Sequence, residues 1–78
     1  MVMVRLFAAA AEAADADQTE VSARTVGELR ERLVQAHGDA LDRVLRQCAI
    51  VVEGSRSDDE VVIVPGTTVD VLPPFAGG

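Results

Sequence analysis

The segment TVGELRERLVQAHG, residues 25–38, decides the fold, because it is the clearest helix in the chain and carries its own start and stop signals. Thr25 is a favoured N-cap residue, and Glu28 three positions later completes a reciprocal capping pair. Apolar side chains recur at helical spacing along one side, at Val26, Leu29, Leu33 and Ala36. His37 and Gly38 end the helix, since glycine tolerates the backbone of a helix C-terminus. We therefore expect an amphipathic helix that buries one stripe.

Two short strands are expected before this helix. In VMVRLF, residues 2–7, apolar positions alternate with the period of a strand that has one face on a core. The alanine-rich residues 8–14 favour a helical turn, and residues 15–18 form a loop. Residues 19–23, with threonine and valine, are the second strand. It is expected to run antiparallel to the first.

After the helix, the pattern changes to short apolar runs separated by turn signals. In chain order we expect a shorter helical segment at 39–47, an apolar strand at 48–52, a turn at 53–55, an acidic loop at 58–60, an apolar run at 61–64 and a last strand at 69–72. Because the run at 61–64 ends at a Pro-Gly turn signal, the helix is followed by either two or three strands.

This order of elements predicts an α+β fold in which one main helix packs on one face of a mixed sheet. The second strand lies against the first, and the last strand returns beside the first after the helical crossover. That arrangement is the β-grasp, or ubiquitin-like, roll. We expect residues 1–72 to form this domain and residues 73–78 to form a flexible C-terminal tail.

Composition limits the possible functions. The chain has 78 residues, enough for one domain, and its net charge of −6 comes from thirteen acids against seven arginines and no lysine. This charge disfavours nucleic acid and favours a basic protein partner, although solubility alone also accounts for it. A single cysteine, Cys48, excludes an internal disulfide and is expected to be a buried structural thiol. Without an apolar run of about 20 residues, we expect a cytoplasmic protein with no membrane partner.

The C-terminal sequence PPFAGG, residues 73–78, is the candidate reactive segment. Pro73 and Pro74 cannot donate hydrogen bonds to a sheet, so the last strand must stop there. Gly77 and Gly78 have no side chains, so the end of the chain can enter a narrow channel. A carboxylate at Gly78 can be adenylated with ATP, and the uncrowded acyl carbon can then be attacked by a sulfur nucleophile.

The two aromatic side chains, Phe7 and Phe75, are candidate partner contacts. Strand alternation places Phe7 and Leu72 on the outward face, with Phe75 nearby, and an exposed apolar patch is typical of an interface. A second small core under a loop is the alternative. The candidate partner-binding set is Phe7, Leu72, Pro73, Pro74, Phe75 and Ala76. No metal spacing, serine elbow or phosphate-binding glycine loop is present, so we expect no catalytic machinery, no metal and no bound cofactor in this chain.

Three stretches, VRLFA (4–8), TVGEL (25–29) and VDVLPPFAGG (69–78), resemble the MoaD/ThiS family of sulfur carriers. The Pro-Pro-x-x-Gly-Gly ending is most like MoaD, the small subunit of molybdopterin synthase. The resemblance implies that a MoeB-like, E1-type adenylyltransferase activates Gly78 with ATP and that a sulfur donor protein supplies the thiocarboxylate. It further implies a heterotetramer with a MoaE-like large subunit, in which the tail gives sulfur to precursor Z (cyclic pyranopterin monophosphate) for molybdenum cofactor biosynthesis. Phe7 and Phe75 match interface positions of the family.

Two turns depart from the family pattern, and they leave other functions open. Pro65-Gly66-Thr67-Thr68 replaces an acidic turn, and Glu53-Gly54 replaces a frequent Asn-Gly. The chain can therefore be a carrier for another pathway, such as thiamine, cysteine or a secondary metabolite. A ubiquitin-like protein modifier is a further alternative. An acyl carrier would need an Asp-Ser-Leu helix start, which is absent.

Overall fold

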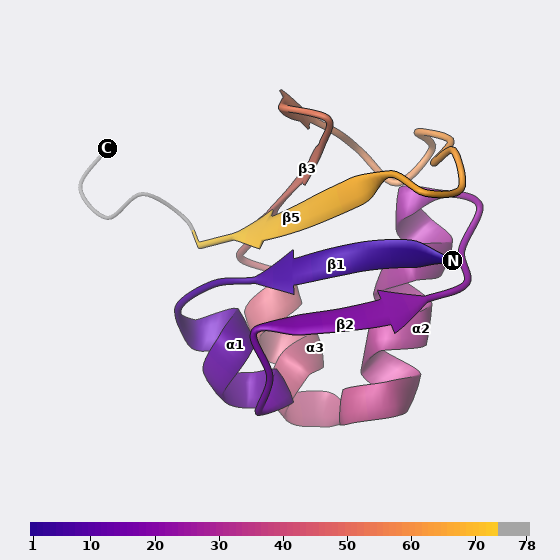
Figure 1. The fold of residues 1–78 in the computed structure, drawn as a ribbon. Helices are drawn as coiled ribbons and strands as arrows, with labels where there is room; N and C mark the ends of the chain where they lie inside the picture. The colour runs from indigo at the N-terminus through magenta and orange to yellow at the C-terminus, as the bar shows by residue number, and fades with distance from the viewer. Residues whose placement is uncertain (74–78) are drawn as a thin grey trace.

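The computed structural model describes residues 1–73. The predicted site residues Pro74, Phe75, Ala76, Gly77 and Gly78 lie outside the described residues. The elements in chain order are β1 (Val2–Leu6), α1 (Ala9–Ala14), β2 (Gln18–Val21), α2 (Val26–His37), α3 (Asp39–Leu45), β3 (Ala49–Val52), β4 (Ser55–Arg56) and β5 (Thr68–Leu72) (Figure 1).

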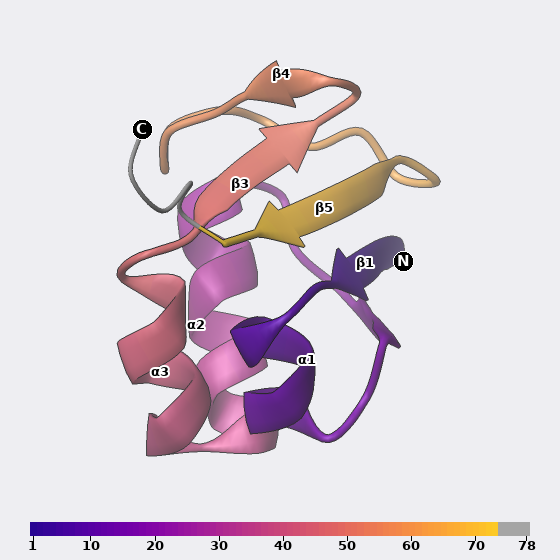
Figure 2. The ribbon, with the colours of Figure 1, turned by 90° about the vertical axis from the view of Figure 1, so that its left-hand side faces the viewer.

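The strands form one mixed sheet in the order β2-β1-β5-β3-β4. β1 lies antiparallel to β2 and parallel to β5, and β3 lies antiparallel to both β4 and β5. The described helices all lie on one side of this curved sheet, so its other side is left without a helical cover (Figure 2). The predicted α+β class and β-grasp roll are confirmed, including the placement of the last strand beside the first.

Burial follows the strand and helix periods. On β1, Val2, Val4 and Leu6 face the helices and are at most 2% exposed. On β5, Val69 and Val71 face the same side, and both are fully buried. The α2 stripe meets them with Val26, Leu29 and Leu33, as predicted. Ala36 does not belong to this stripe: it is exposed, whereas Val34 and His37 of the same turn are partly buried.

The start of α2 carries the predicted cap in altered form. The Thr25 hydroxyl accepts a hydrogen bond from the Glu28 amide at 3.2 Å. The Glu28 carboxylate, however, accepts from the Arg24 amide at 3.2 Å, one residue before the N-cap. The amides of Val26 and Gly27 donate to carbonyl oxygens of the segment at 59–61. The first-turn amides of the helix are thus satisfied by its own cap and by a distant loop.

The apolar run at 61–64 is not a strand of the sheet, which corrects one of the two readings of the sequence. Only an isolated bridge joins Val62 to Thr25, and Val62 and Val64 are 70% and 64% exposed while Ile63 is buried. The backbone of this run pairs with the start of α2, so it is unavailable to the sheet. The fourth strand is instead Ser55–Arg56; the sequence analysis placed Ser55 in a turn and assigned no element to Arg56. It forms because Glu53 and Gly54 both adopt positive φ, which folds the chain back on β3.

Candidate docking face and root of the tail

We call Leu72 and Pro73, where β5 ends and the predicted tail begins, the root of the tail. The end of β5 pairs with strands on both sides. Leu72 is the last residue of β5, and it is the register partner of Ala49 on β3. One residue earlier, Val71 pairs with Leu6 of β1 and with Ile50 of β3. The chain therefore leaves the sheet at Pro73 from a position that two neighbouring strands define.

Phe7 lies at the same end of the sheet. Because Leu6 is the parallel partner of Val71, Phe7 follows β1 at the level where Leu72 ends β5. The Phe7 side chain is 39% exposed, whereas Leu72 and Pro73 are half-buried. Of the predicted partner-binding residues, the structure thus brings Phe7, Leu72 and Pro73 to one end of the sheet.

An ion pair that the sequence analysis did not single out lies beside these residues. Arg5 and Asp70 are register partners on β1 and β5, and the guanidinium donates two parallel hydrogen bonds to the carboxylate, Nε to Oδ1 at 2.6 Å and Nη2 to Oδ2 at 2.8 Å. The hydrogen bond to Asp70, supported by the negative charge of Asp70, raises the pKa of Arg5. The Arg5 guanidinium carbon also lies 5.9 Å from the centroid of the Phe7 ring. Sequence alternation placed Arg5 and Asp70 on outward faces, but only the register shows that they meet.

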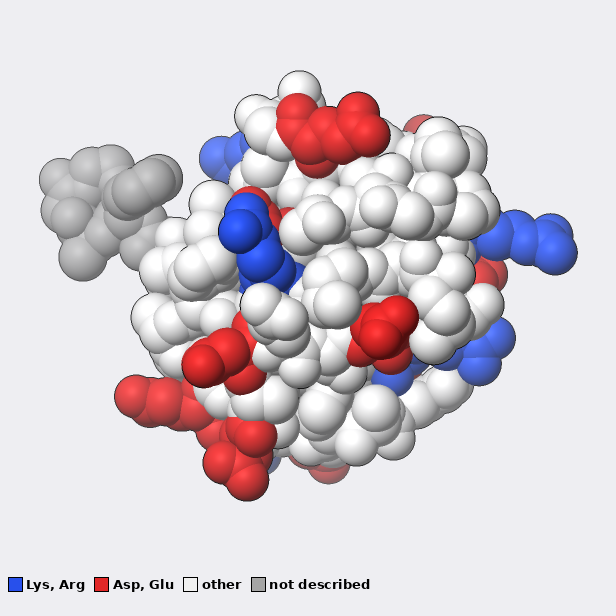
Figure 3. Space-filling model, viewed as in Figure 1, with Lys and Arg blue, Asp and Glu red and all other residues white. Residues whose placement is uncertain are grey.

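The outward face of the sheet carries few charges. Figure 3 views the molecule from the side of this face, and most of the surface between the acidic and basic groups is uncharged. By register, the outward positions around Arg5 and Asp70 include Gln18, the direct partner of Arg5 on β2, together with Met3, Glu20, Ala49, Val51 and Thr68. Alternation on the strands thus surrounds the Arg5–Asp70 ion pair with apolar and uncharged polar side chains and one further carboxylate, that of Glu20. Such a face is suited to docking on a protein.

Cys48 belongs to the core, as predicted. It is 9% exposed, at the turn between α3 and β3, and burial raises the pKa of its thiol while the positive charge of Arg30 opposes that rise. A thiol with a raised pKa is protonated at neutral pH and is a poor nucleophile. His37 ends α2, where its Nε2 atom is buried without a hydrogen-bond partner among the described residues.

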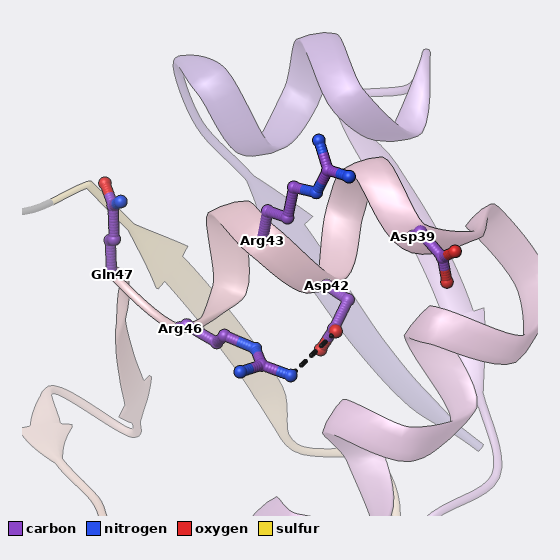
Figure 4. Close-up of a pocket in the computed structure, with 5 residues that line it drawn as sticks. All are labelled: Asp39, Asp42, Arg43, Arg46 and Gln47. Carbon is purple, nitrogen blue, oxygen red and sulfur yellow. Dashed lines mark hydrogen bonds and ion pairs between the residues drawn. The ribbon is translucent and has the colours of Figure 1, made fainter.

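Several open hollows lie on the surface of residues 1–73. The largest described one, of about 650 Å³, lies along the solvent side of α3 and is lined by Asp39, Asp42, Arg43, Arg46 and Gln47 (Figure 4). Arg46 is bound to Asp42 there at 3.2 Å, and Figure 4 shows Gln47 pointing away from that pair. Within residues 1–73, no three potential ligands gather into a metal-binding group, and no helix is long and apolar enough to cross a membrane.

Comparison with known proteins gives a consistent picture. The sequence model of the ThiS family matches residues 4–78. The chain is similar to small archaeal modifier protein 1 from Haloferax volcanii, with 27% identity, a TM-score of 0.78 and coverage of 99% of this chain and 98% of that one. It is also similar to a chain in the complex of subunits 1 and 2 of molybdopterin-converting factor from Helicobacter pylori 26695, with 27% identity, a TM-score of 0.71 and coverage of 99% and 97%. CysO from Mycobacterium tuberculosis shares the fold, with a TM-score of 0.83 at 17% identity and coverage of 96% and 100%. No curated protein matches the chain.

Proposed function

The chain belongs to the ThiS family of sulfur-carrier and ubiquitin-like proteins, and from this premise we propose that it is the sulfur-donating small subunit of a molybdopterin synthase. The observation that carries the proposal is the position of the tail root. Val71 is paired with both β1 and β3, Leu72 is paired with Ala49 of β3 at the level of Phe7, and the sequence PPFAGG follows from there to the C-terminus. The chain thus continues from the end of a central strand into a sequence without side chains at its last two positions.

In the proposed reaction, this chain supplies an acyl group and its partners supply the catalysis. The Gly78 carboxylate attacks the α-phosphate of ATP in an E1-type, MoeB-like enzyme, and pyrophosphate leaves. A persulfide on the sulfur donor protein then attacks the acyl-adenylate, and AMP leaves. A second thiol of the donor attacks the resulting acyl disulfide, so that the thiocarboxylate leaves and a disulfide forms on the donor. A MoaE-like large subunit would receive the tail and transfer the sulfur to cyclic pyranopterin monophosphate. The similarity to subunit 1 of molybdopterin-converting factor supports this choice of pathway.

The site residues have separate roles in this proposal. Gly77 and Gly78 enter the partner's channel, since a side chain at either position would widen the segment. Pro73 and Pro74 end the sheet and restrict φ at the start of the tail. Phe7, Leu72, Phe75 and Ala76 contact the partner around the entrance of that channel.

Intact mass spectrometry tests the proposal. The purified chain is incubated with an E1-type activating enzyme, ATP and a sulfur donor, and its mass is expected to rise by one oxygen-to-sulfur exchange. The thiocarboxylated chain, mixed with the large subunit and cyclic pyranopterin monophosphate, is expected to yield molybdopterin. A chain lacking Gly78 is the matched control and is expected to show neither change. An unchanged mass for the intact chain contradicts every sulfur-carrier function.

A protein modifier is the second candidate, and the similarity to small archaeal modifier protein 1 favours it. Modification would attach Gly78 to lysine side chains of other proteins. A tagged chain expressed in cells would then appear as a ladder of conjugates, and those conjugates would be lost without Gly78. If conjugates form and molybdopterin does not, the chain is a protein modifier and not a subunit of molybdopterin synthase.

A further inference from the structure

The Arg5–Asp70 pair occupies the part of the outward face that adjoins Phe7. Arg5 lies two residues before Phe7 on one chain segment, and Asp70 lies two residues before Leu72 on the neighbouring strand. The guanidinium also approaches the Phe7 ring. A partner surface that covers Phe7 and Leu72 must therefore also cover Arg5.

The guanidinium still has donors to offer. An arginine has five N–H groups, and Asp70 accepts from Nε and from Nη2, so Nη1 makes no hydrogen bond within residues 1–73. The Arg5 side chain is 49% exposed, whereas that of Asp70 is only 22% exposed. The carboxylate thus orients the guanidinium, whose side chain is the more exposed of the two, and Nη1 stays available to a partner.

Arginine keeps its charge at any pH of interest. When an apolar partner surface covers it, it therefore cannot reduce the cost of burial by losing a proton. An unmatched donor at a dry interface weakens binding, whereas an oxygen acceptor placed opposite makes a charge-assisted hydrogen bond. Resting on the proposed function, we propose that Arg5, held by Asp70, is a specificity residue of the docking face. It selects a protein partner that places an acceptor oxygen opposite the guanidinium, within a contact that also covers Phe7 and Leu72.

Binding of the large subunit of molybdopterin synthase tests this inference by isothermal titration. Arg5→Leu is expected to weaken binding at least tenfold, because the partner's acceptor oxygen then loses its donor. Arg5→Lys is expected to recover part of the loss, since it keeps the charge without the fork of donors. The matched control is Arg32→Leu, the same change at an exposed position of α2 on the helical side. It is expected to bind like the unaltered chain, and thermal unfolding verifies that each variant folds.

The outcomes separate this inference from the proposed function. If the unaltered chain binds and Arg5→Leu binds within twofold of it, the specificity role is overturned and the carrier function stands. If the unaltered chain does not bind the large subunit, both are overturned. If sedimentation shows that the unaltered chain self-associates and Arg5→Leu does not, the face belongs to a second copy of this chain, and the inference is wrong.

Discussion

Gly27 of α2 and Asp59 of the acidic loop approach so closely that a Cβ at residue 27 would lie 3.3 Å from both the Cβ and the carbonyl oxygen of Asp59. The Gly27 amide donates to the same carbonyl oxygen at 3.0 Å. Arg30, one turn later, binds the Asp59 carboxylate at 2.9 Å and the Leu45 carbonyl oxygen at 2.9 Å. The acidic loop therefore packs against the start of α2 and stabilises it. Packing against Asp59 favours a small residue at position 27, the glycine of TVGEL, and this reason does not involve a binding partner.

A large side chain at residue 27 is expected to destabilise the fold. Gly27→Leu must displace the Asp59 backbone, and overpacking of this kind costs about 1–3 kcal/mol in the free energy of unfolding. In Gly27→Ala, the gain in helix propensity of about 1 kcal/mol offsets a smaller clash, so its stability should be near that of the unaltered chain. Urea unfolding measures both. Equal stability of the two variants would show that the loop yields without cost.

Deletion of Gly78 is expected to abolish sulfur transfer without affecting stability. Glycine has no side chain to bury, and the apolar core of the described residues is complete by Val71. We expect a change in the free energy of unfolding within about 0.5 kcal/mol. Thermal unfolding and the mass-shift assay are run on the same sample. A large loss of stability would give the chain end a structural role instead.

Phe7→Ala is expected to weaken binding of the large subunit by about 1–3 kcal/mol, the range for a moderate interface anchor. Val62→Ala is the matched control, because Val62 is 70% exposed and lies beside the start of α2, away from the root of the tail. It should leave the affinity unchanged. Unaltered binding by Phe7→Ala, with normal binding by the control, would remove Phe7 from the docking face.

Cys48 is expected to make stability fall in alkaline solution. Burial raises the pKa of the Cys48 thiol in the folded chain, so the unfolded chain releases the proton first, near the ordinary value of about 8.5. The contribution of the protonated thiol to the free energy of unfolding is complete below that pH. It is lost as the pH rises toward the pKa of the thiol in the folded chain. Urea unfolding from pH 7 to 10 should show this slope, and Cys48→Ala should lack it. Identical slopes would contradict a raised pKa.

Much of the fold follows from short-range patterns. Alternation over residues 2–7 and the capped apolar stripe from Thr25 onward each depend on neighbours in the chain, so β1 and α2 could be predicted from the sequence. The run at 61–64 misled for a physical reason: its apolar pattern is that of a strand, but its backbone hydrogen bonds go to residues 24–26. Whether an apolar run joins a sheet depends on which distant segment of the chain forms hydrogen bonds with its backbone amides.

The candidate site, too, has features that follow from the local sequence and features that depend on the tertiary structure. The sequence by itself predicted the reactive end, because PPFAGG and the family pattern are local features, and it predicted that Phe7 and Leu72 face away from the helices. Only the tertiary structure decided the register that places Arg5 opposite Asp70 and pairs Leu72 with Ala49. A shift of one residue would separate the ion pair and turn Phe7 toward the core side. Register is settled by packing between segments more than sixty residues apart, which no local pattern contains.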